Sequence, residues 1–186
     1  MTKKLLVIID TQADFMLSTG ALYVTGAEQL IAPINNYLLN LPADIDSVIM
    51  TYDTHFADTY PDSEEAKQFP IHCVYNTPGW QNVFNDASIL GRDEVNFLRL
   101  EKPVFDMWAT SDTMRDNFID GVSKSGVKDV VVIGVAADFC VHWAVNGFVE
   151  RGFNVEIPRS LTAGIVRDID TVVAEEYAGK NVKVID

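Results

Sequence analysis

The chain has only two cysteines, Cys73 and Cys140, among its 186 residues. Two cysteines cannot form the disulfide framework of a small secreted protein, so the sequence favours a reducing compartment. We therefore expect a cytoplasmic protein, in which a lone cysteine can serve as a catalytic thiol.

Basic residues are also scarce, with 14 Lys and Arg against 27 Asp and Glu and a net charge of −13. A nucleic-acid-binding protein needs a basic surface that neutralises phosphates, and this composition supplies none. We expect no nucleic-acid partner. The acidic balance favours a soluble protein but selects no substrate.

Long apolar runs are absent as well, since none approaches the roughly 18 residues of a membrane-spanning helix. Lys3 and Lys4 precede an apolar run from Leu5 to Ile9, which superficially resembles a secretion signal. That run is short, ends at the carboxylate of Asp10 and is followed by no small-residue cleavage site. We interpret it as a buried first strand and expect no membrane association.

The sequence contains no internal repeat, low-complexity tract or linker-like stretch, so we expect residues 1–186 to form one domain. Short β-branched runs alternate with amphipathic segments, a pattern typical of a parallel sheet covered on both faces. It predicts a three-layer α/β/α fold with a doubly wound, six-stranded, mainly parallel sheet. The expected strands are 4–9, 46–51, 95–100, 127–134, 153–157 and 182–185, and the expected helices are 27–41, 111–125, 138–151 and 168–177. In the segment 53–84, the apolar residues follow neither the helical nor the strand periodicity. Long irregular segments in compact domains are usually functional.

Four polar or reactive features fall just past predicted strand ends: Asp10, the pair Asp53 and His55, Lys102, and Cys140. Parallel sheets bind ligands at the carboxyl ends of their strands, near the point where the strand order reverses. We therefore expect these side chains to meet at one edge of the sheet.

Cys140 follows the strongest strand and begins a helix. Asp138 is a natural N-cap, which would place the thiol in the first helical turn. There the helix dipole and free N–H groups favour a thiolate, and the same N–H groups could hold an oxyanion. A buried structural cysteine is the alternative. His142 lies two residues further along the helix and faces elsewhere, so a Cys-His pair is disfavoured.

Asp10 closes a buried strand, where a carboxylate is costly unless it is paired or used. Near Cys140 it could accept the thiol proton and deliver it to a leaving amine. Lys102 could orient Asp10 and stabilise negative charge. For each residue considered alone, the alternative to a catalytic role is structural. Asp10 could cap a turn, and Lys102 could be an ordinary solvated lysine. No glycine-rich turn follows the first strand, which argues against a nucleotide cofactor.

Two of the three histidines lie in the irregular segment 53–84. Asp53, His55, Glu65 and His72 supply the nitrogen and oxygen donors that suit zinc, iron or manganese. Asp53 and His55 are two residues apart at a strand end, where same-face side chains can share a ligand. The pattern indicates a divalent metal site, and hydrogen-bonded loop histidines are the alternative.

In order along almost the whole chain, these residues resemble the nicotinamidase/isochorismatase-like cysteine hydrolase superfamily. The segment 10–15 (Asp-Thr-Gln-Ala-Asp-Phe) is similar to its catalytic-aspartate motif, Lys102 to its central lysine, and 134–141 (Gly-Val-Ala-Ala-Asp-Phe-Cys-Val) to its nucleophile motif. The resemblance implies catalytic roles for Asp10, Lys102 and Cys140. It also implies a cis peptide bond at Val135–Ala136 and an oxyanion site at the backbone N–H groups of Ala136 and Cys140.

Asp53, His55, Glu65 and His72 resemble the metal-binding loop of nicotinamidases in particular. The resemblance implies hydrolysis of a small amide, nicotinamide to nicotinate and ammonia, through a thioester. The metal would hold the pyridine nitrogen while Phe15 and Trp108 pack on the ring. A homo-oligomer is also implied. Two departures bear on the substrate: Ala137 replaces a frequent threonine, and the segment 103–108 differs from the usual continuation after the lysine.

Three alternatives remain at this point. The chain could act on another small amide, or as a different isochorismatase-like cysteine hydrolase. It could be an inactive binding protein of the same fold, although its triad is complete. A phosphate-receiving signalling domain would also place acidic residues and a lysine after strands, with Asp53 as acceptor. That reading leaves Cys140 and the histidines unexplained.

Overall fold

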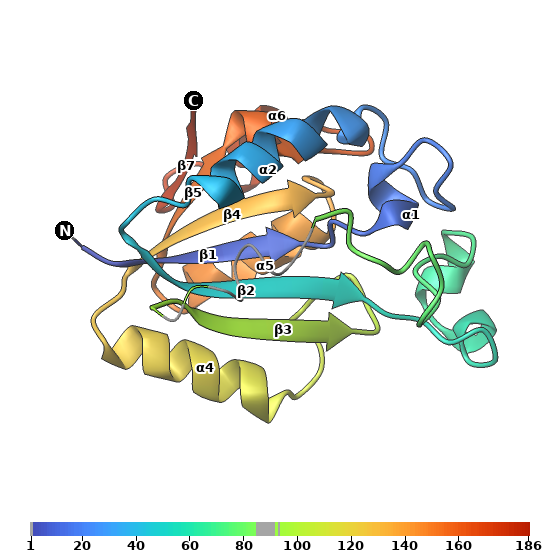
Figure 1. Cartoon of the computed structure of the whole chain (residues 1–186), viewed down its shortest axis with the longest axis horizontal. Helices are drawn as coiled ribbons and strands as arrows, with labels where there is room; N and C mark the ends of the chain where they lie inside the picture. The colour runs from blue at the N-terminus through green and yellow to red at the C-terminus, as the bar shows by residue number, and fades with distance from the viewer. Residues whose placement is uncertain (1, 85–91, 93) are drawn as a thin grey trace.

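The buried apolar runs form the strands of one parallel sheet, shown in Figure 1. The computed structural model describes residues 2–84, 92 and 94–186. The strands are β1 (Lys4–Ile9), β2 (Ile45–Asp53), β3 (Asn96–Lys102), β4 (Asp129–Val135), β5 (Asn154–Pro158), β6 (Thr162–Ala163) and β7 (Val182–Ile185). Their order is β3-β2-β1-β4-β5-β7, and β6 pairs with β4. The predicted parallel α/β sheet is confirmed. The additional strand, β6, has two residues and is too short to leave a pattern.

Helices cover both faces of the sheet, as expected for strands that are apolar on both sides. They are α1 (Ala13–Met16), α2 (Ile31–Leu39), α4 (Thr113–Lys124), α5 (Cys140–Glu150) and α6 (Ile169–Glu176), with 3₁₀ turns η1 (Ala27–Leu30), η2 (Tyr60–Asp62), η3 (Glu65–Lys67) and η4 (Arg159–Leu161). Apolar residues of α4, α5 and α6 share one core, and those of α2 and the segment before it share the other. In Figure 1, α2 passes in front of the sheet and α5 behind it. No helix in the described part of the chain is long and apolar enough to span a membrane.

The strand order reverses between β1 and β4, because β2 and β3 follow on one side of β1 and β4, β5 and β7 on the other. Ile9 and Gly134 are register partners at the carboxyl ends of β1 and β4. A Cβ on Gly134 would lie 2.1 Å from the Ile9 carbonyl oxygen, so only glycine allows this approach. The two strand ends that precede Asp10 and Cys140 therefore lie side by side.

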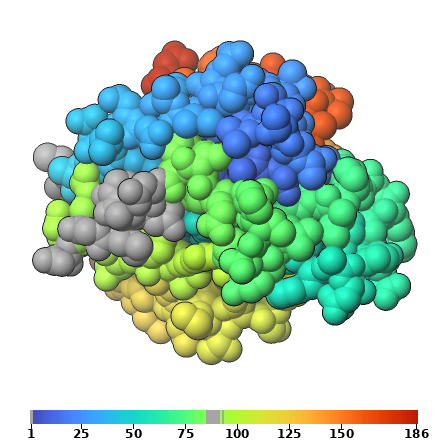
Figure 2. All heavy atoms as spheres, turned by 45° about the vertical axis from the view of Figure 1, so that its right-hand side comes forward, coloured from blue at the N-terminus to red at the C-terminus, as the bar shows by residue number. Residues whose placement is uncertain are grey.

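The irregular segment 53–84 lies beyond the carboxyl end of β2. Figure 2 shows its teal and green atoms beside the blue residues that follow β1. A short antiparallel bridge joins Gln12 to Asn82, and the Val83 N–H donates to the Thr11 carbonyl. This segment therefore closes over the edge at which the polar strand ends meet.

We predict opposite effects for two Gly→Ala substitutions. Gly134 has φ +107° and no room for a Cβ, so Gly134→Ala should lower the free energy of unfolding by about 3 kcal/mol. Gly121 lies in α4 with nothing within 4 Å of an added Cβ, so Gly121→Ala should raise it by about 0.5–1 kcal/mol. Urea denaturation measures both. A neutral Gly134→Ala would contradict the close approach of β1 and β4.

Candidate active site and metal centre

Asp10, Lys102 and Cys140 converge at the carboxyl edge of the sheet. The Lys102 Nζ lies 2.7 Å from Asp10 Oδ2 and 3.7 Å from Cys140 Sγ. All three residues are buried, Asp10 completely. A sulfur atom, a carboxylate and an ammonium that are far apart in the chain thus form one cluster.

Asp10 is held in place by a hydroxyl group from the neighbouring strand. It follows β1 with φ +46°, a left-handed conformation that aspartate tolerates better than most residues. The Thr51 hydroxyl donates to Asp10 Oδ1 at 2.6 Å and accepts the Asp10 backbone N–H at 3.1 Å. These bonds leave Oδ2 directed to Lys102. The sequence reasoning missed Thr51, although a hydroxyl near the carboxyl end of a buried strand was a usable signal.

Lys102 lies between two carboxylates. It is the register partner of Asp53 at the ends of β3 and β2, and its Nζ is 3.3 Å from Asp53 Oδ1 and 3.1 Å from the Val104 carbonyl oxygen. Burial lowers the pKa of Lys102, but the charges of Asp10 and Asp53 outweigh it and hold that pKa well above its usual range. The ammonium therefore stays charged in a buried position.

Cys140 lies in the first turn of α5, as predicted, and is its first residue, but the capping expectation is wrong. The N-cap residue is Phe139. The Asp138 carboxylate instead accepts the backbone N–H groups of residues 165, 166 and 167 at 2.8–2.9 Å. Burial raises the pKa of the Cys140 thiol well above its usual range, and Asp10 adds to this while Lys102 opposes it. The resting group is a thiol and not the thiolate expected from the helix terminus.

Two backbone donors lie next to the thiol. The Val135–Ala136 peptide bond is cis, at the position that the resemblance implies. Within the described residues, the N–H groups of Ala136 and Cys140 have no hydrogen-bond acceptor, whereas those of Ala137, Phe139 and Val141 are all bonded. Ala136 and Cys140 therefore keep donors free for a ligand oxygen.

The four predicted metal ligands form a second, adjoining cluster. One donor atom each from Asp53, His55, Glu65 and His72 lies within 4.8 Å of the others, and all four residues are buried. His55 Nε2 is 3.0 Å from both Asp53 Oδ2 and Glu65 Oε2, and His72 Nε2 is 2.9 Å from Asp53 Oδ2. Donors of a tetrahedral zinc ion stand about 3.3 Å apart, so these side chains need only small movements to coordinate one.

Glu65 gives an independent indication that the cluster fits a cation. Its carboxylate is 1% exposed, and neither oxygen receives a hydrogen bond of acceptable geometry from the described residues, although His55 Nε2 approaches one of them. A buried carboxylate without a full set of donors is costly, and a divalent cation would satisfy it. This donor set is compatible with zinc, iron or manganese.

The protonation of the cluster follows from its charges. Burial lowers the pKa of His55, but the contacts of its Nε2 with the Asp53 and Glu65 carboxylates prevail and raise that pKa to about 9. Burial raises the pKa of Asp53, but Lys102, His55 and His72 together hold it below its usual range. Without a metal, the proton on His55 and the Lys102 ammonium thus offset part of the carboxylate charge.

Gln12 fixes Asp53 from the opposite side. Its Nε2 donates to the Asp53 carbonyl at 2.8 Å and to the Trp80 carbonyl at 3.0 Å, and its Oε1 accepts the Asp53 N–H at 2.7 Å. The side chain is fully buried. Gln12 lies in the motif that contains Asp10, yet its role in holding a metal ligand was not predicted.

A narrow cavity opens beside the thiol, with about 310 Å³ of space that includes the solvent at its mouth. Its walls are apolar except for His72 and Cys140, and are formed by Phe15, Leu22, Val24, Phe69, His72, Phe105, Ala136, Phe139, Cys140 and Ile165. Phe15 lies in this wall, as expected for a ring-binding residue, and its ring centroid is 5.3 Å from that of His72. Phe69, Phe105 and Phe139 were not predicted, and their rings meet one another edge-on or tilted, with centroids 5.5–5.6 Å apart.

Trp108 does not reach this cavity, which corrects the expectation that it lines the substrate site. Its indole N–H donates to the Ala144 carbonyl at 3.3 Å, its ring meets Phe148 edge-on, and Arg151 lies 3.7 Å above it. Trp108 thereby anchors the loop after β3 to α5. Phe105 is the aromatic residue of that loop that lines the cavity.

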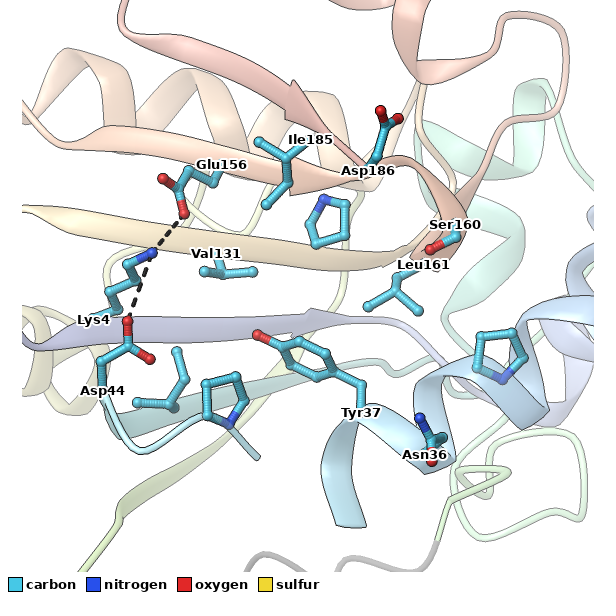
Figure 3. A pocket seen from close by; sticks show the side chains of 14 residues that line it. Lys4, Asn36, Tyr37, Asp44, Val131, Glu156, Ser160, Leu161, Ile185 and Asp186 are labelled. Atoms are coloured by element: carbon cyan, nitrogen blue, oxygen red, sulfur yellow. Dashed lines mark hydrogen bonds and ion pairs between the residues drawn. The ribbon is translucent and has the colours of Figure 1, made fainter. Parts of the chain in front are cut away.

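A wider hollow, with about 940 Å³ of space open to solvent, lies between α2 and strands β5 and β7. Figure 3 shows Lys4 bridging Glu156 and Asp44, with Tyr37 opposite them. Lys4 thus neutralises only part of the carboxylate charge here, and the lining contains no cysteine and no histidine. The chemistry of the described residues therefore concentrates at the smaller cavity.

The geometry also bears on the phosphate-receiving alternative. The aspartate that would accept the phosphate, Asp53, has one oxygen 3.3 Å from Lys102 and the other 3.0 Å and 2.9 Å from two imidazoles. Both Asp53 oxygens therefore have close partners, and neither is free to accept a phosphoryl group.

Comparison with known proteins agrees with the geometry. The isochorismatase domain family matches residues 4–186. The chain is 28% identical to the nicotinamidase/pyrazinamidase of Mycobacterium tuberculosis, over 97% of each chain. It is 25% identical to a nicotinamidase of Saccharomyces cerevisiae, over 98% of this chain and 99% of the relative. The structure of a pyrazinamidase of Pyrococcus horikoshii in complex with zinc has the same fold, with a TM-score of 0.77 at 24% identity over 99% of each chain. The chain belongs to the isochorismatase domain family of hydrolases.

Proposed function

We propose that this protein hydrolyses nicotinamide, or a closely similar small aromatic amide, to the carboxylic acid and ammonia. The observation that carries the proposal is the contact of Lys102 with both Asp10 and Cys140 beside a four-ligand cluster. The similarity to nicotinamidases along nearly the whole chain supports the same substrate class. Another small amide is the second candidate, favoured by Ala137 and by the different continuation after Lys102.

In the first half of the reaction, Asp10 accepts the proton of the Cys140 thiol as the sulfur attacks the amide carbonyl carbon. A base is required because the buried thiol has a raised pKa and is protonated at rest. The developing oxyanion accepts hydrogen bonds from the free N–H groups of Ala136 and Cys140. Asp10 then gives its proton to the amide nitrogen, the C–N bond breaks, and ammonia leaves a thioester on Cys140.

In the second half, Asp10 accepts a proton from a water molecule that attacks the thioester. The C–S bond breaks, the carboxylic acid leaves, and the proton returns to the sulfur. Throughout, the Lys102 ammonium keeps the Asp10 carboxylate next to the sulfur. The apolar walls suit a planar, uncharged ring, and Phe15 provides a face on which it can pack.

Asp53, His55, Glu65 and His72 would hold a divalent cation at the cavity. When bound, the cation supplies a Lewis acid that can bind a ring nitrogen of the substrate. Zinc is the leading candidate, with iron and manganese as alternatives. A single hydrolase domain over residues 1–186 and a cytoplasmic location remain predictions from the sequence, and a homo-oligomer remains a prediction from the family resemblance.

We predict that Cys140→Ala lowers ammonia release from nicotinamide by at least about 10³-fold, since it removes the nucleophile. Ammonia is measured with purified, metal-supplied protein on nicotinamide, pyrazinamide and aliphatic amides. Cys73→Ala is the matched control, and it should retain activity because the Cys73 side chain lies outside the cavity lining. Protein that hydrolyses a different amide and leaves nicotinamide intact would disprove the substrate while preserving the mechanism.

Thr51→Val should reduce kcat by about 10–100-fold, because it frees the Asp10 carboxylate to rotate away from the sulfur. Steady-state kinetics at constant metal concentration measure the loss. Ser47→Ala removes another buried hydroxyl from β2, at the far end of the strand, and should leave kcat unchanged. Equal kcat for both variants would show that Asp10 needs no support from β2.

Metal affinity should rise about tenfold per pH unit between pH 6.5 and 9, since a cation must displace the proton that His55 retains up to about pH 9. The same raised pKa stabilises the metal-free fold below pH 6.5, and this contribution is lost as the pH rises through 9. Competition titrations against a chromophoric chelator at pH 6.5, 7.5 and 8.5 measure the affinity. A flat profile would contradict the proton displacement.

Chelation should abolish ammonia release, and added zinc or manganese should restore it. Activity that is indifferent to chelators would indicate a metal-free amidase and would remove the cation from the proposed function.

A further inference from the structure

Tyr60 lies directly behind the metal cluster and is 5% exposed. It belongs to η2, a short turn with no recognisable motif. Its ring meets the His55 imidazole edge-on, with centroids 4.7 Å apart at 74°, and the His72 imidazole at 5.7 Å and 83°. One aromatic side chain therefore restricts the rotation of both histidines of the cluster.

The Tyr60 hydroxyl organises the backbone that leads to His72. It lies 3.1 Å from the Phe69 carbonyl oxygen and 3.0 Å from the Pro70 carbonyl oxygen, both of which can only accept. The hydroxyl oxygen is also 3.4 Å from His72 Nδ1. Phe69 lines the cavity, so this hydroxyl joins the substrate wall to the metal loop.

The orientation of His72 depends on that backbone. Its Nδ1 lies 2.8 Å from the Pro70 carbonyl oxygen, and because a carbonyl only accepts, Nδ1 carries the hydrogen of this bond. Nε2 then faces Asp53 Oδ2 at 2.9 Å and is the nitrogen available to a cation. A carbonyl that holds the second nitrogen of a ligating histidine fixes its tautomer and ring orientation.

We propose that Tyr60 is a positioning residue of the metal centre. Its ring braces His55 and His72, and its hydroxyl holds the Pro70 carbonyl that presents His72 Nε2. Tyr60 is no ligand itself, because its hydroxyl lies at Nδ1, on the side of the imidazole away from the cluster. The inference rests on the proposed function only in that a divalent cation binds Asp53, His55, Glu65 and His72.

The test is the affinity of the purified full chain for Zn²⁺ and, separately, Mn²⁺, measured at pH 7.5 by competition with a chromophoric chelator. Tyr60→Phe keeps the ring and removes the hydroxyl, and should weaken Zn²⁺ binding about 10-fold. Tyr60→Leu removes both and should weaken it about 100-fold. Tyr37→Phe, whose hydroxyl lies in the hollow beside α2, is the matched control and should bind like the parent.

The melting temperature of each variant in chelator separates metal positioning from folding. A purely structural Tyr60 would lower the melting temperature of the metal-free variants and leave the Zn²⁺ affinity of folded Tyr60→Phe within twofold of the parent, which would overturn the inference. Tyr60→Phe decides the matter if Tyr60→Leu does not fold. A parent chain that binds neither ion would overturn this inference and the proposed metal centre together.

Discussion

The site depends on one buried cation. The Lys102 ammonium contacts Asp10 and Asp53 and lies next to the Cys140 sulfur, and all of these groups are shielded from water. Two buried carboxylates at this edge would repel each other and pay a large desolvation cost without it. Lys102 thus allows two functions to lie side by side at the carboxyl edge of the sheet: the nucleophile Cys140 with its base Asp10, and the metal-binding carboxylate of Asp53.

This arrangement joins the two halves of the site through Asp53. One Asp53 oxygen faces Lys102 and the other faces His55 and His72, so the carboxylate belongs to both clusters. Gln12, from the motif that begins with Asp10, holds the backbone of Asp53. Thr51, on the same strand as Asp53, holds Asp10. The end of β1 and the end of β2 therefore fix each other, and neither half of the site can shift alone.

The sheet and the convergence of Asp10, Lys102 and Cys140 could be predicted because hydrophobic period and strand-end position are local signals. Contacts made across the fold were less accessible. Asp138 looked like a helix cap, but three backbone N–H groups of a distant loop take its carboxylate. Trp108 looked like a pocket residue from its distance after Lys102, but an indole can pack equally well on a helix, and here Arg151 and Phe148 hold it. The Cys140 pKa was misjudged for the same reason, because the helix terminus is a local feature and burial is not.

The dependence on Lys102 can be measured directly with a double-mutant cycle in the free energy of unfolding, using Lys102→Met, Asp10→Asn and the double variant. Lys102→Met alone should cost about 3–5 kcal/mol, since it leaves buried carboxylates without a counter-charge. If the account is right, Asp10→Asn should recover part of that loss in the double variant, giving a coupling energy of at least about 1.5 kcal/mol. Additive single effects would mean that the two groups do not stabilise each other, and would contradict it.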